Sequence, residues 1–72
     1  MIRPDQLGAR IADSRRGRGL TQAELADRMG VTPQAVSKWE RGLACPDLVF
    51  LDELSALLCV SIDWLLTGRR QA

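Results

Sequence analysis

The chain has 72 residues, enough for one small domain that buries roughly 60% of the surface its unfolded form exposes. Hydrophobic residues make up 46% of the sequence and charged residues 26%, which is typical of a folded globular domain and excludes a disordered tail. Histidine is absent, so the usual general base and the commonest metal ligand are missing. We therefore expect no enzyme activity, no metal site and no cofactor.

Location is indicated by what the sequence lacks. No apolar run approaches the roughly 18 residues that a membrane helix requires, and the first residues lack the apolar stretch of a secretory signal. The two cysteines, Cys45 and Cys59, could form one disulfide, but reduced thiols are the simpler expectation. We expect a cytoplasmic protein that does not contact a membrane.

The net charge of +1 is unevenly distributed along the chain. Residues 1–20 carry a charge of +3, whereas the charged residues of 43–66 are all acidic and sum to −4. This separation would orient the domain in the electric field of a polyanion. Nine of the ten basic residues are arginines, which suit planar contacts with phosphates and base edges.

Helical spacing and capping residues predict five helices, and strand signals are nearly absent. Thr21 and Glu24 have the spacing of a capping box, and Pro33 suits the first position of a helix. In chain order, the helices are predicted from about Asp5 to Arg16, from the cap Thr21 to Gly30, from the cap Thr32 to Gly42, after Pro46 and Asp47, and from the cap Ser61 to Gly68. The prediction is an all-α domain over residues 1–68, followed by a short basic tail over 69–72.

The second and third helices form the most informative part of the pattern. Only Gly30 and Val31 separate the end of one helix from the cap of the next, so the two helices must cross steeply, as in a helix-turn-helix. Ala26 is small enough to let the two backbones approach. The residues between the helices are apolar: Leu25, Met29, Val31, Val36 and Trp39.

Four segments resemble the Xre/Cro-type phage-repressor helix-turn-helix family: 21–26 (TQAELA), 30–32 (GVT), 36–42 (VSKWERG) and 60–66 (VSIDWLL). The resemblance covers nearly the whole chain. It implies a compact five-helix, lambda-repressor-like DNA-binding domain whose third helix enters the major groove. It also implies a homodimer on a near-palindromic operator and a role in regulating transcription.

The outward face of the third helix supplies the candidate DNA-binding residues. Gln34 can pair with adenine, Lys38 can donate to guanine, and Ser37 suits a base or a phosphate. Arg41 at the helix end and Gln22 at the start of the second helix are placed for phosphates. The helix cap Thr32 completes the set. The family resemblance supports Gln22 as a backbone clamp and positions 34, 37 and 38 as readers.

Pro33 stands where some family members have a polar reader, so one direct base contact is in doubt. The alternative interpretation of the whole face is an ordinary solvated helix surface, because its polar residue types are common on any surface. The helix-turn-helix spacing and the basic first third of the chain favour DNA.

Arg15 and Glu40 extend apolar stripes, so each charge points toward the core. A single buried charge is strongly unfavourable, and we therefore expect the two to pair and to link the first helix to the third. The family has a similar Arg–Glu pair. The alternative is two solvated charges near helix ends.

Phe50, Ile62 and Trp64 are candidates for an apolar dimer contact. The alternative for Trp64 is the edge of the core. For the whole chain we expect a repressor that blocks transcription by occupying double-stranded DNA as a dimer. The competing function is a protein-interaction module, such as an antitoxin that neutralises a toxin or a domain that binds another regulator.

Overall fold

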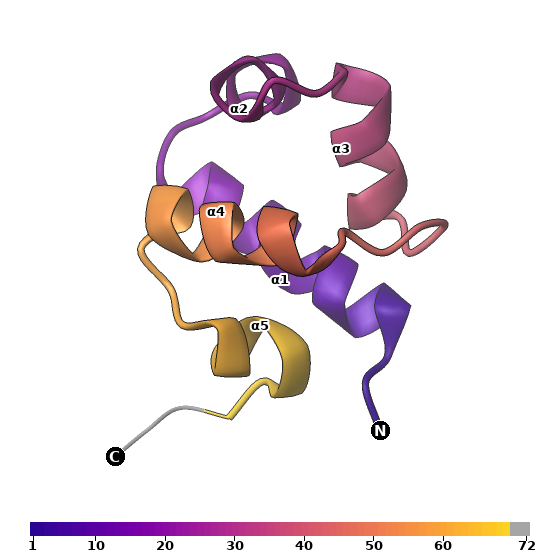
Figure 1. The fold of residues 1–72 in the computed structure, drawn as a ribbon. Helices are drawn as coiled ribbons and strands as arrows, with labels where there is room; N and C mark the ends of the chain where they lie inside the picture. Colours follow the sequence, from indigo (N-terminus) through magenta and orange to yellow (C-terminus); the bar gives the residue numbers. More distant parts are fainter. Residues whose placement is uncertain (70–72) are drawn as a thin grey trace.

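The computed structural model describes residues 1–69 and contains five α-helices (Figure 1). The helices are α1 (Pro4–Gly17), α2 (Gln22–Met29), α3 (Pro33–Glu40), α4 (Leu48–Leu58) and α5 (Ile62–Thr67). No strand occurs within residues 1–69, so the all-α, five-helix prediction is confirmed. Apart from Arg69, the predicted basic tail lies outside the described residues.

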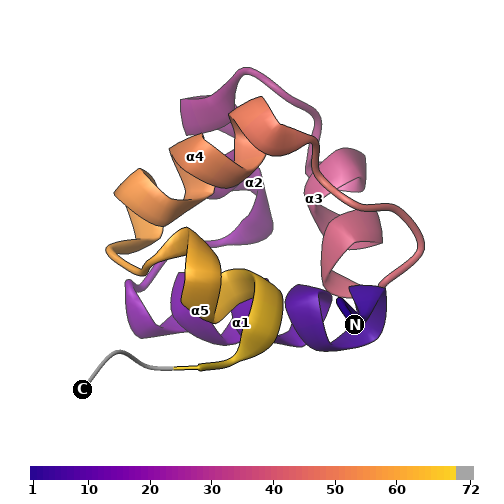
Figure 2. The same ribbon diagram turned by 60° about the horizontal axis from the view of Figure 1, so that its bottom comes forward.

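Helix α1 is the element on which the others are assembled. It packs against α3, α4 and α5, while α2 packs on α3. Figure 1 shows α2 and α3 at the top, α1 and α4 in the middle and α5 at the bottom, and Figure 2 shows α5 lying against α1. The helix-turn-helix is therefore carried at one end of the molecule, away from α5.

Side-chain caps begin four of the helices, three of them at the residues predicted as caps. The hydroxyl oxygens of Thr21, Thr32 and Ser61 accept hydrogen bonds from the backbone N–H three residues later, at 3.0, 3.1 and 2.9 Å. Asp47 does the same for α4 at 3.0 Å. The Thr21 backbone N–H in turn donates to the Glu24 carboxylate at 2.9 Å, which completes the predicted capping box.

Three helices end at a residue whose backbone has the left-handed conformation. Gly30 ends α2 and Gly68 ends α5, with φ of 69° and 75°, as glycine readily allows. Cys59 ends α4 with φ of 57°, a conformation that a residue with a Cβ adopts only at a steric cost. Both Cys45 and Cys59 are free thiols at exposed positions.

One apolar cluster joins all five helices. Its buried members are Leu7, Ile11, Leu25, Ala26, Met29, Val36, Trp39, Leu51, Leu54, Leu58 and Leu65. The centroids of the Trp39 and Phe50 rings also lie 5.5 Å apart, so the two rings pack together between α3 and α4 at the edge of the core. Within residues 1–69, no helix is long and apolar enough to cross a membrane.

Gly8 sets the distance between α1 and α3, and the sequence analysis missed it. A Cβ atom at this position would lie 2.6 Å from the Glu40 carbonyl oxygen and closer still to that of Trp39. Both obstacles are backbone atoms, which cannot rotate aside as a side chain can. The absence of a side chain at residue 8 therefore lets the end of α3 rest directly on α1.

Replacing Gly8 with alanine should therefore destabilise the domain by about 3 kcal/mol, because α3 must move off α1 to admit the methyl group. Gly17, in the last turn of the same helix, is the matched control, since its Cβ would meet nothing within 4 Å. Gly17→Ala should instead stabilise the domain by about 0.5 kcal/mol. Urea unfolding followed by circular dichroism measures both changes. A Gly8→Ala protein as stable as the wild type would contradict the close-contact interpretation.

Candidate DNA interface

Helices α2 and α3 form the predicted helix-turn-helix. Gly30 turns the chain in the left-handed conformation. The Val31 N–H donates a hydrogen bond to the Ala26 carbonyl oxygen at 3.0 Å. Ala26 and Val36 are fully buried where the helices meet. Figure 1 shows the two helix axes crossing steeply. Within residues 1–69, the outer face of α3 stays exposed.

The three predicted readers lie on this outer face of α3, and Arg41, predicted to contact phosphate, follows the last residue of the helix. Gln34, Lys38 and Arg41 are exposed, and Ser37 is half-buried between them. The Arg41 Nε donates a hydrogen bond to the Ser37 carbonyl oxygen at 3.4 Å, so the guanidinium lies beside the end of the helix. The structure therefore places these four residues together, with hydrogen-bonding groups available to a ligand.

Thr32 and Pro33 begin α3 at the exposed end nearest α2. The Thr32 hydroxyl oxygen accepts from the Ala35 N–H, which leaves the hydroxyl proton free to donate. Pro33 has neither a backbone N–H nor a polar side chain, so it offers no donor to DNA. Gln34 is therefore the polar side chain of the first turn of α3.

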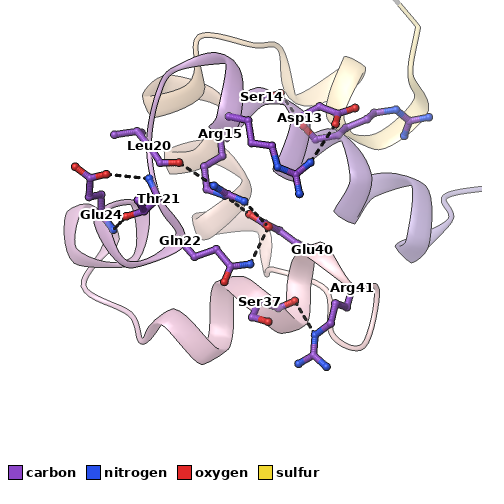
Figure 3. Close-up of polar contacts among 12 residues, drawn as sticks. Asp13, Ser14, Arg15, Leu20, Thr21, Gln22, Glu24, Ser37, Glu40 and Arg41 are labelled. Carbon is purple, nitrogen blue, oxygen red and sulfur yellow. Dashed lines mark hydrogen bonds and ion pairs between the residues drawn. The ribbon is translucent and has the colours of Figure 1, made fainter.

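Arg15 and Glu40 form a buried, bidentate ion pair between α1 and α3 (Figure 3). The Arg15 Nε and Nη2 atoms donate to Glu40 Oε2 and Oε1 at 2.6 and 3.0 Å. The remaining Arg15 nitrogen, Nη1, donates to the Leu20 carbonyl oxygen at 2.8 Å. Only 10% of the Arg15 side chain and 5% of the Glu40 side chain are exposed. Each charge is thus withdrawn from water and met by hydrogen bonds.

Gln22 joins this ion pair from the first residue of α2. Its Nε2 donates to Glu40 Oε1 at 2.9 Å, so one carboxylate links side chains from α1, α2 and α3. Sequence analysis predicted Gln22 as a phosphate clamp but did not predict its contact with Glu40. A glutamine at the start of a helix gives no sequence signal for a partner 18 residues away.

The protonation states follow from this network. Burial acts to raise the pKa of Glu40, but the hydrogen bonds from Arg15 and Gln22 and the nearby positive charges outweigh it and lower the pKa. The hydrogen bond to Glu40 raises the pKa of Arg15 against the opposing effect of burial. Both groups are therefore charged at neutral pH.

Arg16 adds an exposed positive charge in the last turn of α1 and was not among the predicted site residues. Its charge makes a small contribution to lowering the pKa of Glu40. The side chain is 65% exposed, and its pair with Asp13 spans 3.6 Å, a weak surface contact. The cluster of arginines in the first 20 residues was the available signal.

The predicted dimer candidates do not stand out as an exposed patch. Phe50, Ile62 and Trp64 are each half-buried. Phe50 packs on the Trp39 ring, and both Phe50 and Trp64 pack against the core, as the core-edge alternative for Trp64 expects. Sequence spacing could not show this because the partners come from other helices. The dimer contact stays a prediction. The exposed large apolar side chains are instead Met1, Ile2, Leu43, Leu48 and Val49.

A family model described as helix-turn-helix matches residues 11–65, which is most of the chain. The chain belongs to this helix-turn-helix family. The predicted resemblance to the Xre/Cro-type family is thereby confirmed.

Solved structures with the same fold include two complexes with DNA. The P22 c2 repressor bound to a synthetic operator aligns with a TM-score of 0.83 and 38% identity, over 88% of this chain and 96% of that chain. The biofilm regulator SinR in complex with DNA aligns with a TM-score of 0.75 and 38% identity, over 82% and 95%. The lambda-repressor-like fold is therefore confirmed.

Curated relatives are named as transcriptional regulators. The prophage-derived regulator YonR of Bacillus subtilis is 44% identical over 61 residues, and SinR of Bacillus subtilis is 36% identical over 66 residues. The matches cover 85% and 90% of this chain but span only 56% and 60% of those proteins. The family is one of regulators and not of enzymes, as predicted from the composition.

Breaking the buried ion pair should destabilise the domain strongly. Arg15→Ala or Glu40→Ala should each lower the free energy of unfolding by roughly 3 kcal/mol, because the remaining charge stays buried without its partner. Asp13→Ala, which breaks the exposed pair with Arg16, is the control and should change it by less than about 0.5 kcal/mol. Thermal and urea unfolding measure the difference. Unchanged unfolding midpoints in both pair variants would argue against a stabilising pair.

Acid should remove the contribution of Glu40 to the free energy of unfolding. Its pKa in the folded chain lies below the ordinary value of 4.5, so its stabilising effect is complete above that pH and is lost as the pH falls toward the folded pKa. The free energy of unfolding should therefore differ most between wild type and Glu40→Gln near neutral pH, and the difference should shrink in acid. Glu24, whose pKa is also lowered, titrates alike in both proteins. A difference that is constant with pH would contradict the assignment.

Proposed function

We propose that this chain is the DNA-binding domain of a transcriptional regulator and that α3 reads double-stranded DNA in the major groove. The observation that supports it best is the exposed face of α3, where Gln34 and Lys38 project from a helix whose other face is buried, with exposed Arg41 directly after the helix. The DNA-bound P22 c2 repressor and SinR structures support the proposal because they share the fold. Residues 1–68 form the domain in this proposal, and 69–72 a short basic tail.

Each polar residue of the interface has a proposed role. Gln34 pairs with adenine and Lys38 donates to guanine, while Ser37 contacts a base or a phosphate according to the groove. Arg41, Gln22 and Thr32 hold the phosphate backbone, with Arg16 adding charge from the end of α1. Pro33 contributes no base contact, so fewer bases are read directly than in relatives with a polar residue there.

Two copies are proposed to bind together on a near-palindromic operator. Their α3 helices would occupy successive major grooves about 34 Å apart, and the bound dimer would block transcription by occlusion. Ile62, half-buried on the first turn of α5, is the first residue to test for a dimer contact, ahead of Phe50 and Trp64, which pack on the core. The regulator would act in the cytoplasm, where bacterial DNA lies.

A protein partner is the competing function. SinR is also known in complex with the SinI protein, and that complex aligns with this chain at a TM-score of 0.78 and 39% identity. A domain that serves only to bind a toxin or another regulator should tolerate loss of Lys38 and Gln34, whereas a DNA reader should not.

Selection from a random duplex pool at fixed salt tests the proposal. Wild-type protein should enrich a two-fold symmetric motif. Lys38→Ala should bind that motif roughly tenfold more weakly, because one base contact is lost. Arg69→Ala removes the same charge beyond α5, away from α3, and should bind nearly as the wild type does. Salt must be held constant because nonspecific binding falls steeply as salt rises.

Two results would count against DNA reading. No enriched motif with wild-type protein would favour the protein-interaction module. An identical enriched pool with Lys38→Ala would show that α3 does not read the bases.

A further inference from the structure

We propose that Glu40 is a positioning residue for DNA binding, because its carboxylate fixes the Gln22 side-chain amide so that a free N–H faces a DNA phosphate. The inference rests on the proposed DNA-binding function and goes beyond it. Under it, the role of Glu40 in binding is distinct from its role in holding the fold together.

The orientation of the Gln22 amide follows from the chemistry of its partner. An ionised carboxylate can only accept hydrogen bonds, so the nitrogen and not the oxygen of the amide must face Glu40. The Nε2 atom lies 2.9 Å from Glu40 Oε1, and Figure 3 shows the amide oxygen pointing away from the ion pair. An amide nitrogen carries two hydrogens, and the contact with Glu40 uses one. The second N–H remains for a phosphate oxygen.

Glu40 can hold Gln22 because Arg15 holds Glu40. Arg15 binds both carboxylate oxygens, at 2.6 and 3.0 Å, and fixes the plane of the carboxylate. The same Arg15 donates to the Leu20 carbonyl oxygen, just before α2 begins. The start of α2 is therefore attached to the end of α3 through one carboxylate. Without that attachment, the amide of a half-buried glutamine would rotate freely before binding, and ordering it would weaken the affinity.

A purely structural role for Gln22 predicts a different outcome. If its amide served only to satisfy Glu40, replacing it would lower stability and leave DNA affinity unchanged in a folded protein. Glu40 already has two hydrogen bonds from Arg15, so we expect the stability of the fold to depend little on Gln22. DNA affinity is the property that should respond.

The test compares the effect of Gln22→Met on DNA affinity in two backgrounds. In the wild type, it should weaken binding about tenfold, as expected for losing a hydrogen bond to a charged group. In the second background, Arg15→Met/Glu40→Met, the amide has no carboxylate to orient it, and Gln22→Met should weaken binding by less than twofold. An apolar replacement of a buried ion pair usually preserves the fold, whereas Glu40→Gln alone leaves the Arg15 charge buried without its ionised partner.

Affinities are measured on the selected duplex, below the unfolding temperature of every variant. Because glutamine is neutral, Gln22→Met should leave the salt dependence of binding unchanged, whereas Arg16→Ala should reduce it. A tenfold effect of Gln22→Met in both backgrounds would overturn the positioning role alone, as would no effect in the wild type. If the wild type binds no duplex specifically, the proposed function fails and this inference fails with it.

Discussion

The buried carboxylate of Glu40 is the constraint on which the arrangement of this domain depends. Removing two charges from water is unfavourable, and it is offset only where the geometry is close and the remaining groups are satisfied. Here Arg15 and Gln22 supply three hydrogen bonds to one carboxylate. Apolar packing tolerates small sliding movements, but this set of directional bonds does not. The ion pair therefore fixes how α3 is oriented on α1, beyond the fact that the two helices pack.

Close backbone packing at Gly8 complements the ion pair. Gly8 lies against the carbonyl oxygens of Trp39 and Glu40, so the last turn of α3 touches the backbone of α1 directly. The glycine sets how near the two helices lie, and the Arg15–Glu40 hydrogen bonds set the position and the orientation of α3 relative to α1. Together they make α3 a rigid extension of α1, so that residues on its outer face are held in place before any ligand binds.

Local chemistry explains which features could be predicted from the sequence. Threonine and serine caps and the glycine ends of helices act within four residues, so they locate α2, α3 and α5. The inward charges Arg15 and Glu40 could be paired because each lies on an apolar stripe. The contact of Gln22 with Glu40 and the close approach at Gly8 depend on distances between helices, which no local pattern contains. Cys59 in a left-handed conformation was missed for the opposite reason, since the local rule favours glycine there.

The base-contacting side chains proposed on α3 are too few to account for a specific DNA sequence by themselves. In the proposed DNA-binding mode, Pro33 contacts no base, and Gln34, Ser37 and Lys38 are the side chains that would contact bases. Specificity in such a domain must then come also from DNA shape, sensed through phosphates whose positions change with groove width and bending. A phosphate contact that is held rigidly discriminates between DNA shapes better than a mobile one, because a mobile side chain adapts to many geometries. The fixed Gln22 amide, anchored through Glu40 to the same helix that carries the readers, meets that requirement.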